Sequence, residues 1–192
     1  WNPLVWDAIA QYYPWRVFLG RSLSSGHIPY WNPHQFCGNP FLANGQSAVF
    51  YPPNWLFAII DPKSALTVLA LLHLTLCGYF MYLLVKDLGI SESSAIASGI
   101  SYELCAFIIL WLELPTFICV ATWLPAVIWC IHRTIKRSSY VWAVFAAITL
   151  ALSILAVHLQ FAMYVWFAAA SWALYGIVLA VRDKQYRLRR AV

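Results

Sequence analysis

The residues whose types could do chemistry gather in the first 63 positions of the 192-residue chain. They combine a carboxylate, a guanidinium, amides and an indole: Asp7, Gln11, Arg16, Trp31, Asn32, Asn44 and Gln46. A carboxylate such as that of Asp7 can act as a general base and take a proton from a hydroxyl group. Arginine matches phosphate oxygens with paired hydrogen bonds, so Arg16 and Arg21 are candidates for holding a phosphate. The alternatives are structural, with Asp7 capping a short helix and the arginines lying along a membrane surface.

The elements that must position these residues are membrane helices. Hydrophobic residues make up 62% of the chain and charged residues 10%, whereas soluble domains carry about 25% charged residues. The mean hydropathy is +0.70. The composition therefore predicts an integral membrane protein. The net charge of +5 comes from short basic clusters between apolar stretches. Such clusters set membrane topology, and they do not indicate a nucleic-acid partner.

The cysteines have neither paired nor metal-type spacing, and their odd number argues against a disulfide framework. They are Cys37, Cys77, Cys105, Cys119 and Cys130. No Cys/His metal cluster, P-loop or dinucleotide fingerprint stands out, so no cofactor is predicted, and a divalent metal is left open. The chain starts at Trp1 without a signal peptide. We interpret it as an excerpt of a longer chain that lacks the first span and the C-terminal part.

Five stretches are predicted as spans, because a spanning helix needs roughly 20 apolar residues. They cover residues 64–85, 93–112, 116–131, 140–157 and 160–181. Asp61 is expected to cap the first span, with Pro62 in its first turn. Residues 140–181 would be about 63 Å long as one helix at 1.5 Å per residue, so they are expected to cross twice and reverse near His158.

The basic clusters predict which way the spans face. Residues 133–137 form one cluster and residues 182–190 form another, and both are expected on the cytoplasmic side. Segment 1–63, Glu113 and the turn at His158 and Gln160 then fall on the external side. The predicted fold class is an all-α polytopic transmembrane helical bundle, residues 64–192, with a long external loop, residues 1–63, that bears short interfacial helices.

Within this loop, residues 6–13 and 15–23 have apolar groups at helical spacing, separated by Pro14 and followed by Gly26 as a stop. Residues 27–53 are rich in proline, glycine and asparagine, which predicts a defined irregular path. Inside the spans, an unpaired Glu103 would cost about 2.5–3.5 kcal/mol. Glu103 must therefore be paired, protonated or in a wet cavity, and His73 is a candidate partner.

The order and spacing of many landmarks resemble the bacterial YfhO-type membrane proteins over nearly the whole chain. In the first loop they are Asp7, Gln11-Tyr12-Tyr13-Pro14-Trp15, Gly26-His27-Ile28-Pro29-Tyr30-Trp31-Asn32-Pro33, Gly38-Asn39-Pro40, Asn44, Gln46-Ser47 and Tyr51-Pro52-Pro53. In the spans they are His73-Leu74, Gly78, Met81-Tyr82, Leu88-Gly89, Trp123-Leu124-Pro125, His158 and Gln160. Two positions depart from the pattern. Val157 stands where glycine is expected, and Glu113 stands near an expected histidine.

This resemblance implies a polytopic glycosyltransferase of the GT-C class in a bacterial cell membrane. Such an enzyme takes its sugar from a polyprenyl-phosphate donor in the membrane lipid and passes it to an acceptor outside the membrane. The resemblance makes Asp7 the catalytic base. The residues expected to bind substrate are Gln11, Arg16, Trp31, Asn32, Gln46, Glu113, His158 and Gln160. The structural alternative for Trp31-Asn32-Pro33 is a turn anchored by a buried indole, and for His158 and Gln160 it is the capping of a tight turn.

Two other classes remain open on the sequence. A transporter or lipid flippase would place its polar residues at mid-membrane and often has broken helices. A non-catalytic assembly subunit would not need Asp7. The sugar, the acceptor and the oligomeric state are not predicted.

Overall fold

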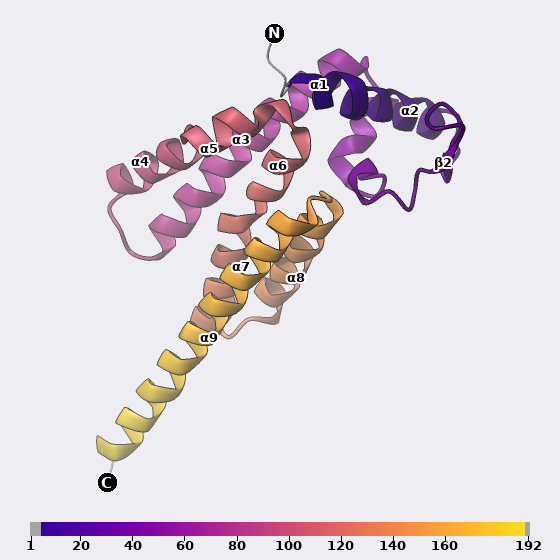
Figure 1. The fold of residues 1–192 in the computed structure, drawn as a ribbon. Helices are drawn as coiled ribbons and strands as arrows, with labels where there is room; N and C mark the ends of the chain where they lie inside the picture. The colour runs from indigo at the N-terminus through magenta and orange to yellow at the C-terminus, as the bar shows by residue number, and fades with distance from the viewer. Residues whose placement is uncertain (1–4, 191–192) are drawn as a thin grey trace.

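The computed structural model describes residues 5–190 and is mostly helical (Figure 1). Among the described residues, four helices are long and apolar enough to cross a membrane: Pro62–Asp87, Glu92–Glu113, Pro115–Arg137 and Leu159–Arg182. This agrees with the predicted all-α membrane protein. The first helices and the short strands lie together at one end of these long helices (Figure 1).

The chain begins with one continuous helical stretch. It consists of α1 (Val5–Asp7), the π-helical turn η1 (Ala8–Tyr12) and α2 (Tyr13–Ser24). Pro14 falls in the first turn of α2, where its missing N–H group is tolerated. The sequence predicted a kink or a new helix start at Pro14, and the structure has the second of these, because the π-helical turn ends at Tyr12 and α2 begins at Tyr13. Gly26 ends the helix as predicted, with a φ of 75° that glycine adopts without strain.

Residues 27–61 follow an irregular path over the end of the long helices. The strands β1 (Trp31–Asn32) and β2 (Asn39–Pro40) pair antiparallel, and two 3₁₀ helices follow, η2 (Gly45–Ser47) and η3 (Pro52–Ala58). An apolar cluster joins this segment to the helices beneath it. Its buried members are Tyr12, Trp15, Leu19, Phe41, Val49, Leu114 and Phe117. We call residues 5–61 the N-terminal cap.

The helix α3 (Pro62–Asp87) begins where the sequence predicted. An Asp61 side-chain oxygen accepts hydrogen bonds from the backbone N–H groups of Lys63 and Ser64, at 3.1 and 3.2 Å. The next helix, α4 (Glu92–Glu103), turns back and packs against α3 (Figure 1). The two backbones approach closely at Gly78 and Gly99. A Cβ atom on Gly99 would lie 2.7 Å from the Gly78 carbonyl oxygen, so this contact requires glycine.

The second predicted span is interrupted in the structure. After α4 the chain is extended at Cys105, with a ψ of 149°, and then forms α5 (Ala106–Leu110) and η4 (Trp111–Glu113). The interruption follows Glu103 directly. A side chain at the end of a helical segment is next to backbone groups without a helical partner, which is a more polar setting than a helix interior.

The third span consists of α6 (Pro115–Ala121) and α7 (Trp123–Arg137). The chain then forms α8 (Tyr140–Leu155) and α9 (Leu159–Arg190). The reversal predicted near His158 is therefore confirmed. With 16 residues, α8 is about 24 Å long, which is less than the roughly 30 Å hydrocarbon core. The five predicted spans correspond to four full-length helices and one shorter apolar helix.

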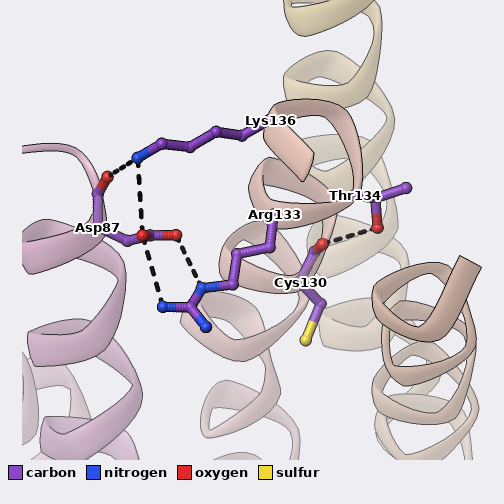
Figure 2. Close-up of polar contacts among 5 residues, drawn as sticks. All are labelled: Asp87, Cys130, Arg133, Thr134 and Lys136. Atoms are coloured by element: carbon purple, nitrogen blue, oxygen red, sulfur yellow. Dashed lines mark hydrogen bonds and ion pairs between the residues drawn. The ribbon is translucent and has the colours of Figure 1, made fainter. Parts of the chain in front are cut away.

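The helices end at two opposite levels of the bundle. The cap lies over the starts of α3, α6 and α9. At the opposite level, which we call the basic end, Asp87 accepts a 2.9 Å hydrogen bond from Nε of Arg133 and lies 3.7 Å from Nζ of Lys136 (Figure 2). The charged side chains described at this level are Lys86, Asp87, Glu92, Arg133, Lys136, Arg137 and Arg182.

Candidate functional site

A cavity of about 270 Å³ lies where the cap meets α3 and α6. The cap supplies one wall from η1, α2 and η3, and the first three turns of α3 supply another. The polar residues that line it are Tyr12, Tyr13, Arg16, Asn54, Thr67, His73 and Glu113. Thr67 is also exposed on α3, so one wall of the cavity reaches the surface of the helical bundle. Leu66, Leu69 and Ala70 make this wall apolar.

Arg16 is the one basic side chain other than histidine among the described residues that line this cavity. Its side chain is only 2% exposed, and its guanidinium donates a hydrogen bond to the backbone carbonyl of Ser47. The ion pairs among the described residues do not include Arg16. Burial lowers the pKa of Arg16 to about 10, which still leaves it charged at neutral pH. A buried charge is costly unless it is paired, so this cavity favours an anionic occupant.

The two carboxylates predicted for the site are placed differently. Glu113, at the end of η4, lines the same cavity as Arg16. Asp7 is exposed and does not line the cavity. It directly precedes Ala8, which does. Asp7 therefore lies at the rim, on the helical stretch that also carries Arg16. The Asp7 carboxylate is therefore accessible from outside the cavity.

The structure brings Gln11 and Gln46 together. The amide nitrogen of Gln11 donates to the side-chain oxygen of Gln46 at 3.1 Å, and the Tyr12 hydroxyl donates to the same oxygen at 3.4 Å. Asn44 caps η2 by accepting a 3.1 Å hydrogen bond from the backbone N–H of Gln46. Gln46 is thus held in place by two neighbours and by its own turn.

A second hollow, of about 260 Å³, lies between the cap and the reversal from α8 to α9. Asn44, Gly45 and Gln46 line it on one side, and residues 157–160 line it on the other. The sequence predicted that His158 and Gln160 would lie in one pocket at the level of Asp7 and Glu113. The structure instead divides the candidate residues between two hollows, since His158 lines one with Gln46 while Arg16 and Glu113 line the other.

His158 is held by aromatic rings. Its ring centroid lies 4.2 Å from that of Phe117 and 4.7 Å from that of Phe161. Burial lowers the pKa of His158 below its usual value, which favours the neutral ring at pH 7. Its Nδ1 atom is buried without a hydrogen-bond partner among the described residues. Val157 before it has a φ of 71°, a conformation that favours glycine, which gives a physical reason for a glycine at this position.

Trp31 and Asn32 do not line either hollow. The Trp31 indole is 56% exposed, so the alternative of a turn anchored by a buried indole is wrong. The buried residue of the pair is Asn32, whose side-chain oxygen accepts a 3.0 Å hydrogen bond from the His34 N–H. Asn32, with Tyr13, Arg21 and Gln35, lines a separate groove on the outer side of α2.

His73 has a role that the sequence did not indicate. Its Nδ1 atom lies 2.7 Å from the Leu69 carbonyl, so Nδ1 carries the proton and Nε2 accepts from the Tyr51 hydroxyl, also at 2.7 Å. Trp123 donates to the same hydroxyl at 3.0 Å. The partner of His73 is therefore Tyr51, and the predicted pairing with Glu103 is wrong. Glu103 packs instead against Gly78, where a Cβ atom would lie 2.1 Å from its carboxylate.

Among residues 6–182, whose side chains the structure describes, no three His, Cys, Asp or Glu residues lie close enough together to hold a metal ion. No protein-family model, curated protein or solved structure matches this chain.

Proposed function

We propose that this chain belongs to a membrane glycosyltransferase that takes a sugar from a polyprenyl-phosphate donor and passes it to an acceptor on the external face of a bacterial membrane. The observation that carries the proposal is the buried Arg16 guanidinium in a cavity at the end of an apolar helical bundle. The resemblance of the cap and spans to YfhO-type proteins supplies the reaction class.

The cavity suits the donor because its two ends differ in polarity. Arg16 would bind the phosphate, since a guanidinium matches phosphate oxygens with paired hydrogen bonds. The apolar side chains of Leu66, Leu69 and Ala70 would contact the first isoprene units. Because Thr67, beside this apolar wall, is exposed on α3, the polyprenyl tail would leave the cavity there into the bilayer while the phosphate reaches Arg16.

The transfer step follows from these positions. The acceptor hydroxyl attacks C1 of the sugar, and the bond between C1 and the donor phosphate oxygen breaks, with its electron pair leaving on the phosphate. Asp7 takes the proton of the attacking hydroxyl. Arg16 stabilises the charge of the departing polyprenyl phosphate, so that group needs no proton donor. Gln46 and Gln11, which are hydrogen-bonded to each other, would hold the acceptor or the sugar near the rim.

The orientation of the protein in the membrane is inferred from the charges at the two ends of the helical bundle. The basic end would face the cytoplasm, since lysine and arginine are enriched there in membrane proteins. The cap and the cavity would then lie outside, where sugars are added to cell-envelope polymers, lipids or proteins.

The test is a donor-binding and transfer assay on the complete chain with a radiolabelled polyprenyl-phosphate sugar. Arg16→Gln should lose donor binding, and Arg21→Gln should retain it, because Arg21 is exposed on the same helix and does not line the cavity. Arg16→Lys keeps a charge and separates loss of binding from loss of folding. Equal binding by Arg16→Gln and wild type would contradict the proposal.

One observation favours a second candidate, a transporter or flippase for a lipid-linked substrate. The interrupted helix at Leu104 and Cys105 next to Glu103 is a feature of transporters, in which broken helices surround the binding site. In that case Glu103→Gln should stop substrate movement across the membrane, while Asp7→Asn should leave it unchanged. If the protein is a glycosyltransferase, Asp7→Asn should stop its activity and Glu103→Gln should leave it unchanged.

A further inference from the structure

A groove of about 500 Å³ runs between the end of α7 and the middle of α9 at the basic end. It lies at the opposite level from the cavity under the cap and plays no part in the proposed transfer. Its charged and polar residues come from α7 and α9, and they are His132, Lys136 and Tyr175. Its other walls are apolar, with Ile135 on α7 and Leu179 and Ala180 on α9.

Lys136 is the exposed cation at this groove, and its amine donates a 2.8 Å hydrogen bond to the Asp87 backbone carbonyl, which leaves its other N–H groups for a ligand. Asp87 is already held by Arg133, through hydrogen bonds of 2.9 and 3.5 Å. Arg133 is in turn fixed between the rings of Trp129 and Trp142, with its guanidinium 4.8 and 4.6 Å from their centroids. The Lys136 side chain is 53% exposed, and its amine lies 3.7 Å from the Asp87 carboxylate. Figure 2 shows Arg133 and Lys136 both contacting Asp87, Arg133 at the carboxylate and Lys136 at the carboxylate and the backbone carbonyl.

The basic end as a whole has an excess of positive charge. Among the described side chains, five cations at this end face two carboxylates, Asp87 and Glu92. Glu92 is paired with Lys86 at 3.2 Å. The groove therefore lies in a positive field that attracts anions and repels cations.

His132 adds a second polar contact beside Lys136. The two residues are four apart on α7 and share one face of the helix. The Nε2 atom of His132 is buried and has no hydrogen-bond partner among the described residues. The His132 ring lies beside Trp172, with centroids 6.3 Å apart. Buried polar atoms normally have a hydrogen-bond partner, and the protein alone supplies none for this ring nitrogen of a residue that lines the groove.

The floor of the groove is an extended apolar surface, which suits an acyl chain better than a compact ion. Gly176 lets α9 approach α7, since a Cβ atom there would lie 2.4 Å from Cδ1 of Ile135. Beyond it, Leu179 and Ala180 continue the apolar surface along α9. Trp172 and Tyr175 are residue types that prefer the boundary between head groups and acyl chains.

We propose that this groove binds an anionic phospholipid. The head-group phosphate lies between the Lys136 amine and Nε2 of His132, and one acyl chain lies along Ile135, Leu179 and Ala180. The positive field selects an anionic lipid over a zwitterionic one, and the apolar walls select a lipid over free phosphate. The site is separate from the donor cavity, so it does not depend on the glycosyltransferase proposal.

Tryptophan quenching by brominated lipid tests this directly, because Trp172 lines the groove. The complete chain is placed in nanodiscs of phosphatidylcholine that contain the same mole fraction of brominated phosphatidylglycerol or of brominated phosphatidylcholine. Wild type should lose more fluorescence with the brominated phosphatidylglycerol. This difference should disappear in Trp172→Phe, which removes the reporter.

Two further variants locate the lipid. Lys136→Gln should abolish the preference for phosphatidylglycerol, and Ala180→Phe should abolish it by filling the groove while leaving the Asp87 contacts intact. The controls are Lys86→Gln, which removes a charge at the same level outside the groove, and Ala170→Phe, which adds a ring on the exposed face of α9 outside it. Both controls should behave as wild type.

Equal quenching by the two brominated lipids would overturn the proposal and show an ordinary lipid-facing surface. A preference that survives in Ala180→Phe would also overturn it by placing the lipid elsewhere. Absence of quenching by either lipid would overturn it in favour of a groove filled by another protein segment.

Discussion

The Tyr51 hydroxyl lies 2.7 Å from Nε2 of His73, and this hydrogen bond ties the N-terminal cap to the interior of the first long helix. Both side chains are fully buried. Trp123 of α7 donates to the same hydroxyl, so one oxygen connects the cap, α3 and α7. His73 also lines the cavity that contains Arg16. The shape of the candidate site therefore depends on this connection.

Tyr51→Phe should lower the free energy of unfolding by about 2–3 kcal/mol, because it leaves a buried ring nitrogen and a buried indole N–H without partners. The measurement is denaturant or thermal unfolding in detergent. Tyr30→Phe is the matched control, since Tyr30 is 65% exposed in the same cap. Similar stability losses in the two variants would show that the buried hydroxyl has no special role.

Donor binding should depend on pH through Arg16. Burial lowers the pKa of Arg16 to about 10, so the guanidinium stays charged from pH 7 to about 9, and affinity should be flat over this range. As the pH rises through about 10, the charge is lost and the affinity for the phosphate should fall. Equilibrium binding of the radiolabelled donor between pH 7 and 10.5 checks this. In Arg16→Lys, the pH at which the affinity for the donor falls should shift to the pKa of the lysine amine.

Stability at acidic pH should depend on His158. Burial lowers its pKa in the folded protein, so below the unfolded value of about 6.5 the unfolded chain takes up a proton more readily. The contribution of this residue is present above that pH and is lost as the pH falls toward the folded pKa. His158→Phe should therefore lose less stability between pH 7 and 5 than wild type. The exposed His27 provides the control, and His27→Asn should follow wild type.

Accessibility of cysteines tests the orientation of the two ends. Cys37 is exposed in the cap, while Cys77, Cys119 and Cys130 are buried. In intact cells, an impermeant maleimide should label Cys37. A Ser138→Cys variant in a Cys37→Ser background should be labelled only after the membrane is permeabilised, because Ser138 follows α7 at the basic end. Labelling of both positions from the same side would contradict the orientation.

Local signals in the sequence predicted the parts of the fold that depend on neighbouring residues. Asp61 caps α3, Gly26 ends the first helix and the chain reverses before Leu159, because each of these depends on a few adjacent residues. The sequence did not predict that α8 is short or that the second span is interrupted at Cys105. Both depend on how the helices pack against one another.

The candidate site was only partly predictable for the same reason. Arg16 and Glu113 were singled out by residue type, and they line one cavity. The burial of Arg16, the bond between Tyr51 and His73 and the contact between Gln11 and Gln46 all join residues more than 20 positions apart. No periodicity within one segment encodes such pairs. Trp31 was singled out because of its type, yet it lies outside both hollows.

The most direct test of the central claim is sugar transfer by the Asp7→Asn variant of the complete chain, with a radiolabelled polyprenyl-phosphate sugar as donor. A general base contributes about 10²–10⁴-fold to the rate, so this variant should lose transfer by about that factor. It should still bind the donor, because Asp7 lies at the rim and Arg16 is intact. Transfer within a few-fold of wild type would contradict the account.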